Sequence, residues 1–317
     1  MKKKIVLIML VALMGLTGCQ NKEKEENQEA YRQIGINCMA EGDYNGAIDA
    51  FQNALGLSLA KISDKELDIC YYKAEAQYKA GKVDDAISTY SALLDYNKKN
   101  SDAYYLRGSL YLVEKKKDDA FKDFENAVKY SSDNYEMYVE ISNQLAAAGE
   151  TDKSKNYLKQ ALDISGKSAE DYTWRGRIYL MMKDYDKAKE QFDEAVKKDS
   201  TDVQLYLGQL YEAQGDNDKA QTAYESYAKN NSDNPKVLES LASLATAKKD
   251  YGKAVDYLTM ALKTKEPENE QNLRQDLILA YENNGDFAAA KEQMETYLKK
   301  YPNDEKAKRE NTFLQTR

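Results

Sequence analysis

One short pattern recurs along the 317 residues of this chain: a small residue, followed four positions later by a large aromatic or aliphatic residue. The small residues are Ala47, Ala86, Ala120, Ser154, Ala188, Ala220, Ala254 and Ala290, and the large ones are Phe51, Tyr90, Phe124, Leu158, Phe192, Tyr224, Leu258 and Met294. Successive small residues are 39, 34, 34, 34, 32, 34 and 36 positions apart. Such a period predicts an array of similar structural units, each packed against its neighbours.

A second small residue lies twelve positions before the first in seven of the eight repeats. These residues are Gly35, Ala74, Gly108, Ser142, Gly176, Gly208 and Ala242. Two helices that present small residues to each other can pack closely, and a large residue one turn later fills the space beside them. We therefore expect each repeat to be a pair of antiparallel helices.

The turn between the two helices of each repeat is expected to need a left-handed backbone conformation, which glycine adopts most readily. Glycine holds this position in five repeats, at Gly42, Gly81, Gly149, Gly215 and Gly285. In the other three repeats the position is held by Lys115, Lys183 and Lys249. A lysine in this conformation is expected to carry some strain.

The pattern resembles the tetratricopeptide repeat, whose length is 34 residues. The resemblance covers residues 28–302 and implies an all-α fold, a right-handed superhelical α-solenoid of about eight helical hairpins. The repeats are expected near residues 28–61, 67–100, 101–134, 135–168, 169–200, 201–234, 235–268 and 271–302. Residues 62–66 are expected to extend the second helix of the first repeat or the loop after it. Residues 303–317 are expected to form a solvent-facing capping helix.

The first 18 residues predict a lipoprotein signal peptide rather than part of the fold. Lysines at positions 2–4 precede an apolar run over 5–17, which is short for a permanent membrane span. The run ends in Leu16-Thr17-Gly18-Cys19, which resembles a bacterial lipobox. That resemblance implies cleavage before Cys19 and a covalent lipid on its sulfur. An ordinary secretory signal and an uncleaved anchor are the alternatives.

Lipidation at Cys19 has consequences for the residues that follow and for the location of the protein. Residues 19–27 are expected to be the lipidated cysteine and a flexible tether, because 20–27 are polar without an apolar period. We expect the protein at the bacterial cell envelope, on the outer face of the cytoplasmic membrane, or on the outer membrane if the source is Gram-negative.

The composition argues against several classes of function. The chain has no histidine, and so lacks the commonest general base and the commonest zinc ligand. Its 46 basic and 54 acidic residues give a net charge of −8, which disfavours a nucleic-acid partner. It has no glycine-rich phosphate loop and no nucleophile elbow. We therefore expect no enzyme activity, no metal, and no cofactor besides the lipid on Cys19.

The resemblance also implies a concave face, lined by the first helix of each hairpin, that takes extended peptides or partner helices. Placing the family pattern on this sequence gives partner-binding candidates at Tyr71, Glu75, Tyr78, Asp102, Tyr105 and Arg177. The tyrosines among them are either interface anchors or packing residues between neighbouring helices.

An acidic residue recurs at one position of successive repeats. The residues at this recurring acidic position are Glu29, Asp68, Asp102, Glu136, Glu170 and Asp202. Two interpretations are open. They form a negative strip for a basic partner, or they lie in the first helical turn because a negative charge there offsets the helix dipole.

Two further cysteines, Cys38 and Cys70, fall on packing positions of the first helices in repeats one and two. We expect buried free thiols, because the rise along neighbouring helices separates the two positions too far for a disulfide. Neither cysteine has a partner at metal-binding spacing.

These observations together predict a membrane-anchored scaffold or adaptor that binds proteins or peptides on its concave face. The alternative is a ligand-binding lipoprotein, such as a glycan receptor, on the same repeat scaffold. The near-constant repeat spacing leaves little room for the insertions that such a receptor would need.

Overall fold

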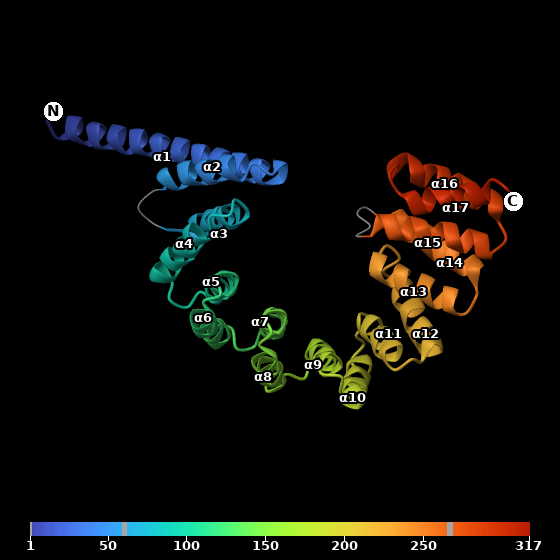
Figure 1. Cartoon of the computed structure of the whole chain (residues 1–317). Helices are drawn as coiled ribbons and strands as arrows, with labels where there is room; N and C mark the ends of the chain where they lie inside the picture. The colour runs from blue at the N-terminus through green and yellow to red at the C-terminus, as the bar shows by residue number, and fades with distance from the viewer. Residues whose placement is uncertain (1, 59–61, 265–268) are drawn as a thin grey trace. The chain divides into compact units, whose positions relative to one another are not determined.

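The computed structural model describes residues 2–58, 62–264 and 269–317, and the side chains of these residues from position 22 onward. Within these ranges the chain forms seventeen α-helices and no strand (Figure 1). The predicted all-α array of paired helices is thereby confirmed. The chain divides into two compact units, an N-terminal unit, Met1–Ile164, and a C-terminal unit, Ser165–Arg317.

The N-terminal unit holds four helical hairpins. Its helices are α1 (Lys2–Glu41), α2 (Tyr44–Gly56), α3 (Asp64–Lys79), α4 (Val83–Tyr96), α5 (Ser101–Val113), α6 (Lys117–Tyr130), α7 (Tyr135–Ala147) and α8 (Thr151–Leu162). The odd-numbered helices are the first helices of their hairpins, and each packs against the even-numbered helix that follows it.

The C-terminal unit holds four more hairpins and a final single helix. Its helices are α9 (Ala169–Met181), α10 (Tyr185–Val196), α11 (Val203–Ala213), α12 (Asn217–Ala228), α13 (Pro235–Ala247), α14 (Tyr251–Leu262), α15 (Glu270–Asn283), α16 (Phe287–Lys300) and α17 (Glu305–Leu314). Helix α17 packs on α16, where a capping helix was predicted.

The small residues of each hairpin allow the close helix contact that the sequence predicts. A Cβ atom placed on Gly35 would lie 2.4 Å from the Phe51 ring, and one on Gly176 would lie 2.3 Å from the Phe192 ring. The small and large residues of the recurring pattern are buried in all eight hairpins. In the fourth hairpin both small positions are serines, and their hydroxyls, of Ser142 and Ser154, bond to each other at 2.8 Å.

The turn inside each hairpin has the left-handed conformation predicted for it. The glycines at this position have φ between 77° and 81°, and Lys115, Lys183 and Lys249 have φ of 59° to 60°. One further residue, Asp199, has φ 60° and was not predicted. It lies in the connection between α10 and α11, inside the shortest of the repeat intervals.

Asparagine and aspartate side chains determine where many helices begin. Asn100 and Asn134 accept hydrogen bonds from backbone N–H groups three residues later, at the starts of α5 and α7. Asp43 and Asp184 do the same for the second helices α2 and α10. Each such cap satisfies a backbone donor that the helix itself leaves unpaired.

The start of the second repeat differs from the prediction. Residues 64–66 belong to α3 and not to an extension of the preceding helix or its loop. Ser63 caps α3, and the Glu66 carboxylate accepts a hydrogen bond from the Ser63 backbone N–H, which completes a capping box. Because of this capping box, α3 begins earlier in the sequence than the repeat pattern alone predicts.

The N-terminal region also differs from the prediction. Helix α1 runs from Lys2 to Glu41 and includes residues 19–27, where a flexible tether was expected. The stretch is rich in glutamate, glutamine and lysine, which favour helix, and Lys22 and Glu26 form an i,i+4 ion pair at 3.6 Å. The Cys19 side chain lies outside the residues whose side chains are described. In the described part of the chain, no helix combines the length and the hydropathy that crossing a membrane requires.

Candidate functional site

A hollow of about 540 Å³ lies on the first helices of three successive hairpins in the N-terminal unit. Its lining residues are Asp68 and Tyr71 from α3, Asp102, Tyr105 and Leu106 from α5, Asn134 at the start of α7, and Glu136, Met137 and Glu140 from α7. The repeat produces this arrangement, because a spacing of 34 residues puts equivalent side chains on the same face of successive hairpins. Three of the predicted partner-binding residues, Tyr71, Asp102 and Tyr105, therefore meet at one site.

Hydrogen bonds to the neighbouring repeats hold the two tyrosines of the hollow in place. The Tyr71 hydroxyl donates to Asn100 Oδ1 at 2.7 Å, and Gln144 Nε2 donates to the Tyr105 hydroxyl at 2.6 Å. The Tyr71 ring also lies 6.0 Å from the Tyr90 ring. Each tyrosine therefore packs between helices and also presents a surface to the hollow, so the two interpretations of these residues are compatible.

Both tyrosines are neutral hydrogen-bonding groups near pH 7. Burial raises the pKa of the Tyr71 phenol to about 12, and the charge of Asp102 adds to that rise. Burial likewise raises the pKa of Tyr105 to about 12, with a contribution from Glu140. Both carboxylates line the same hollow as the two phenols.

The hollow carries four carboxylates, and only one of them is ion-paired within the described residues. Asp68 pairs with Arg32, whose Nε lies 2.6 Å from Asp68 Oδ2. No ion pair within the described ranges involves Asp102, Glu136 or Glu140, and all three are exposed. The site is therefore strongly negative.

The structure separates the two explanations of the recurring acidic position. Asp102, Glu136 and Glu170 lie in the first turns of α5, α7 and α9, where the helix dipole favours them. Asp68 lies beyond the first turn of α3, because that helix begins at Asp64. Glu29 lies far from the start of α1. The dipole therefore accounts for Asp102, Glu136 and Glu170, whereas Glu29 and Asp68 pair with Arg32 instead.

The remaining predicted partner-binding residues do not line this hollow. Glu75 pairs with Lys79 at 2.7 Å, one turn further along α3. Tyr78, near the end of α3, is 44 % exposed. Arg177 belongs to the C-terminal unit, where its guanidinium lies 3.8 Å from the Trp174 ring centre. These residues stay proposals for partner binding, on one surface around Glu75 and Tyr78 and another around Arg177.

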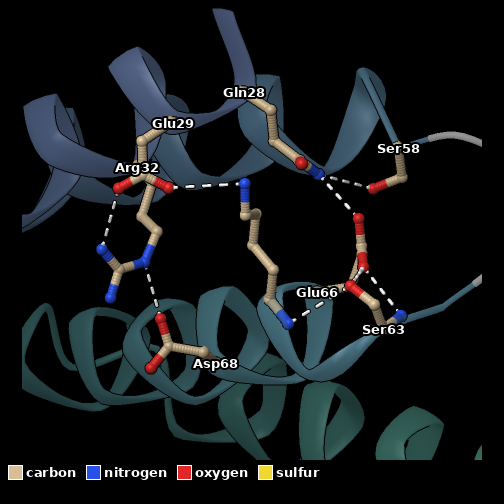
Figure 2. A network of polar contacts seen from close by, with 8 residues as sticks. Gln28, Glu29, Arg32, Ser58, Ser63, Glu66 and Asp68 are labelled. Carbon is tan, nitrogen blue, oxygen red and sulfur yellow. Dashed lines mark hydrogen bonds and ion pairs between the residues drawn. The ribbon is translucent and has the colours of Figure 1, made fainter. Parts of the chain in front are cut away.

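A polar network joins α1 to α3 at the edge of the hollow (Figure 2). Arg32 bonds to Asp68 and also reaches Glu29 Oε1 at 3.2 Å, and Lys65 lies 3.7 Å from the other oxygen of Glu29. The hydrogen bond from Arg32 to Asp68 raises the pKa of the guanidinium further. Arg32 is therefore a permanent cation that links the first two hairpins.

The same network buries a carboxylate, that of Glu66. Gln28 Nε2 donates to Glu66 Oε1 at 2.8 Å, and the Ser63 backbone donates to Oε2 at 2.8 Å (Figure 2). Burial opposes ionisation of this carboxyl, but hydrogen bonds from Ser63 and Gln28 stabilise the anion and lower its pKa to about 2. Glu66 is thus a structural anion between α1 and α3.

Several residues of the hollow were not singled out from the sequence. Glu140 lies one turn after Glu136, so it shares a helix face with a recurring acidic residue without occupying a recurring position itself. Leu106 and Met137 give the hollow an apolar part. The i,i+4 spacing of the two glutamates was the signal in the sequence that could have indicated Glu140.

The C-terminal unit has a hollow of its own, of about 670 Å³, between α11, α13, α14 and α15. Its polar lining includes Glu212, Glu239 and Asp276 together with Asn272 and Asn283. Burial raises the pKa of the Asp276 carboxyl. This hollow is also on first helices for the most part, but it lacks the two hydrogen-bonded tyrosines of the N-terminal one.

The described side chains form neither a metal site nor a reactive cysteine site. No group of three or more histidine, cysteine, aspartate or glutamate residues there is arranged to hold a metal ion. Cys38 and Cys70 are free thiols, and they are half-buried where full burial was expected. Burial raises the pKa of the Cys70 thiol, which keeps it protonated and unreactive near pH 7.

Comparison with family models assigns the repeats. Five matches to tetratricopeptide repeat models cover residues 39–110, 101–134, 169–202, 205–269 and 277–304. Together they span more than half of the chain and both of its units. The chain belongs to the tetratricopeptide repeat family. Proteins of this family are typically non-catalytic and bind peptides or other proteins. This chain is a tetratricopeptide repeat scaffold for protein–protein interaction.

Individual relatives are distant. The chain is 25 % identical over 223 residues to the BBSome complex member BBS4 of Bos taurus, covering 70 % of this chain and 42 % of that protein. It thus spans less than half the length of this curated relative.

Comparison with solved structures finds three distant matches of this kind among others. A tetratricopeptide repeat protein from Parabacteroides merdae has 17 % identity and a TM-score of 0.45, over 92 % of this chain and 99 % of that one. The type IV pilus biogenesis factor PilW has 17 % identity and a TM-score of 0.45, over 65 % of this chain and 97 % of that one. The structure of the APC/C hetero-tetramer Cut9-Hcn1 has 14 % identity and a TM-score of 0.49, over 88 % of this chain and 54 % of that one.

Proposed function

We propose that this protein is a lipid-anchored scaffold at the bacterial cell envelope, and that it binds a segment of another protein in the hollow of its N-terminal unit. The observation that carries the proposal is the convergence of Tyr71, Tyr105 and Asp102 on one concave site. Half-buried tyrosines held by hydrogen bonds are preorganised contact surfaces, because little further side-chain entropy is lost on binding.

The anchoring part of the proposal is based on the sequence Leu16-Thr17-Gly18-Cys19. A lipid on Cys19 would hold the repeats on the outer face of the cytoplasmic membrane, or on the outer membrane of a Gram-negative cell. A Cys19→Ser variant should move the protein from the membrane fraction to the soluble fraction of the envelope. If this variant stays in the membrane fraction as the unchanged protein does, the anchoring proposal is wrong.

The binding part can be tested by affinity capture from envelope extract. The bait is the full-length protein, beside a Tyr71→Ala, Tyr105→Ala double variant whose helix content is checked by circular dichroism. A protein captured by the first bait and lost with the second supports the proposal. A protein captured equally by both baits would place the binding site on another surface, such as the one around Glu75 and Tyr78 or the one around Arg177.

The same baits can be applied to a glycan array, which addresses the alternative of a ligand-binding lipoprotein. Retention of a glycan, with no protein captured from the extract, would contradict the scaffold proposal and favour the receptor. Retention of a protein and of no glycan is the result that we expect.

A further inference from the structure

The network in Figure 2 shows what one residue of the recurring acidic position binds within this molecule. Arg32 of α1 extends to the next hairpin and places its guanidinium on Asp68 of α3, at 2.6 Å. Its guanidinium also lies 5.5 Å from the centre of the Tyr72 ring. A carboxylate at this position is therefore bound by an arginine that comes from the preceding repeat.

The next two hairpins lack such an arginine. Arg32 lies three residues after Glu29, and the residues three after Asp68 and Asp102 are Tyr71 and Tyr105. A tyrosine cannot supply a positive charge to the acidic residue of the following hairpin. Asp102 and Glu136 consequently have no ion pair among the described residues, although they are equivalent to Asp68 in the repeat.

The hollow beside these carboxylates has the dimensions and chemistry for a long cationic side chain. The tyrosine rings, Leu106 and Met137 provide apolar surface, and Asp102, Glu136 and Glu140 provide negative charge. Lysine and arginine combine an apolar stem with a charged end, and both can place that end over an aromatic ring. An acidic segment would instead meet like charges here, which is costly at an interface.

We propose that the N-terminal hollow binds an extended polypeptide segment that carries lysine or arginine, with the cationic side chains taking at Asp102 and Glu136 the role that Arg32 has at Asp68. This inference rests on the proposed function, since it specifies the chemistry of the partner at the same hollow. In this arrangement the tyrosine rings contact the apolar stems of the lysine or arginine side chains, and the carboxylates pair with their charged ends.

The test uses fluorescence anisotropy of a labelled peptide whose lysines are separated by glycine and serine, beside the same peptide with glutamate at each lysine. The full-length protein is compared with an Asp102→Asn, Glu136→Gln variant, which changes exposed side chains by one atom each and keeps the fold. A Glu170→Gln, Asp202→Asn variant is the matched control. It removes two exposed charges at the equivalent positions of the C-terminal unit.

We expect the lysine peptide to bind and the glutamate peptide not to bind. The hollow variant should bind the lysine peptide about five- to tenfold more weakly, since each exposed ion pair contributes only a few-fold to affinity. The control variant should bind it within about twofold of the unchanged protein, because its lost charges do not line the hollow and salt screens exposed charges. Added salt should reduce the difference between the two variants.

Equal weakening in the hollow and control variants, or equal binding of the two peptides, would overturn the inference. Its failure is distinguishable from failure of the proposed function. A partner captured from envelope extract with undiminished affinity for the Asp102→Asn, Glu136→Gln variant would contradict the inference alone. Specific binding of the lysine peptide, with no protein captured from the extract, would contradict only the proposed scaffold function.

Discussion

In three hairpins a lysine adopts the left-handed backbone conformation that glycine adopts in the other five. Replacing these lysines with glycine should stabilise the protein. Lys115, Lys183 and Lys249 have φ near +60° in the turn where the glycines have φ near +80°. This conformation costs a residue with a Cβ atom about 1–2 kcal/mol. Glycine gains about 0.5–1 kcal/mol of extra conformational entropy in the unfolded chain, which offsets part of the benefit.

Each Lys→Gly substitution should therefore stabilise its hairpin by about 0.5–1 kcal/mol. No ion pair or side-chain hydrogen bond involves these lysines within the described part of the chain, so no contact is lost. The three turns lie in different hairpins, and their effects should add to about 1.5–3 kcal/mol in the triple variant. The measurement is the urea midpoint followed by far-ultraviolet circular dichroism.

The control for this prediction is Lys155→Gly. Lys155 is an equally exposed lysine, but it lies in the interior of α8, where glycine should destabilise by about 1 kcal/mol. A triple turn variant whose midpoint equals or falls below that of the unchanged protein would refute the reasoning, because it would mean that the left-handed turn imposes no strain on lysine.

Three further predictions concern the helix contacts and buried carboxylates. Gly176→Ala should destabilise by about 1–3 kcal/mol in urea unfolding, because its Cβ would overlap the Phe192 ring, and an unchanged midpoint would contradict the close packing. The pKa of Glu66 is lowered to about 2, so the ionised carboxyl should stabilise the fold fully above about pH 5 and lose this effect as the pH falls toward 2. A Glu66→Gln variant should lose this part of the pH dependence of stability, and a pH profile identical to that of the unchanged protein would refute the prediction. Burial and the neighbouring Glu310 raise the pKa of Glu282, so this carboxyl ionises less readily in the folded chain than in the unfolded chain. Glu282→Gln should therefore raise the thermal midpoint at pH 7 but not at pH 4, and a lower midpoint at pH 7 would contradict this.

The regular part of the fold could be predicted because the repeat applies one packing rule eight times. The sequence indicated the buried small and large residues and even the three lysines in left-handed turns. Features outside the repeat were not predicted. The early start of α3 depends on the Ser63 and Glu66 capping box, and the left-handed Asp199 depends on one short connection. Both features depend on a few local residues, so the repeat period does not predict them.

The candidate site was predicted to the extent that it follows the repeat. Tyr71, Asp102 and Tyr105 meet because they occupy equivalent positions on neighbouring first helices. Glu75 and Arg177 also occupy groove positions, but Glu75 pairs with Lys79 on its own helix, and the Arg177 guanidinium lies over the Trp174 ring of α9 and the Tyr206 ring of α11. Whether a long side chain faces a partner or folds onto its own helix depends on nearby side chains, and a pattern of residue spacing does not contain that information.

The most direct test of the central claim is photo-crosslinking in growing cells. A benzoyl-phenylalanine in place of Tyr105 lies in the hollow, and one in place of Tyr96, which is 54 % exposed on α4 and outside the hollow, is the control. We predict a protein adduct from the Tyr105 position that becomes weaker in the Asp102→Asn, Glu136→Gln background, and none from the Tyr96 position. Adducts that form only from the Tyr96 position, or none from the Tyr105 position, would contradict a partner site in the N-terminal hollow.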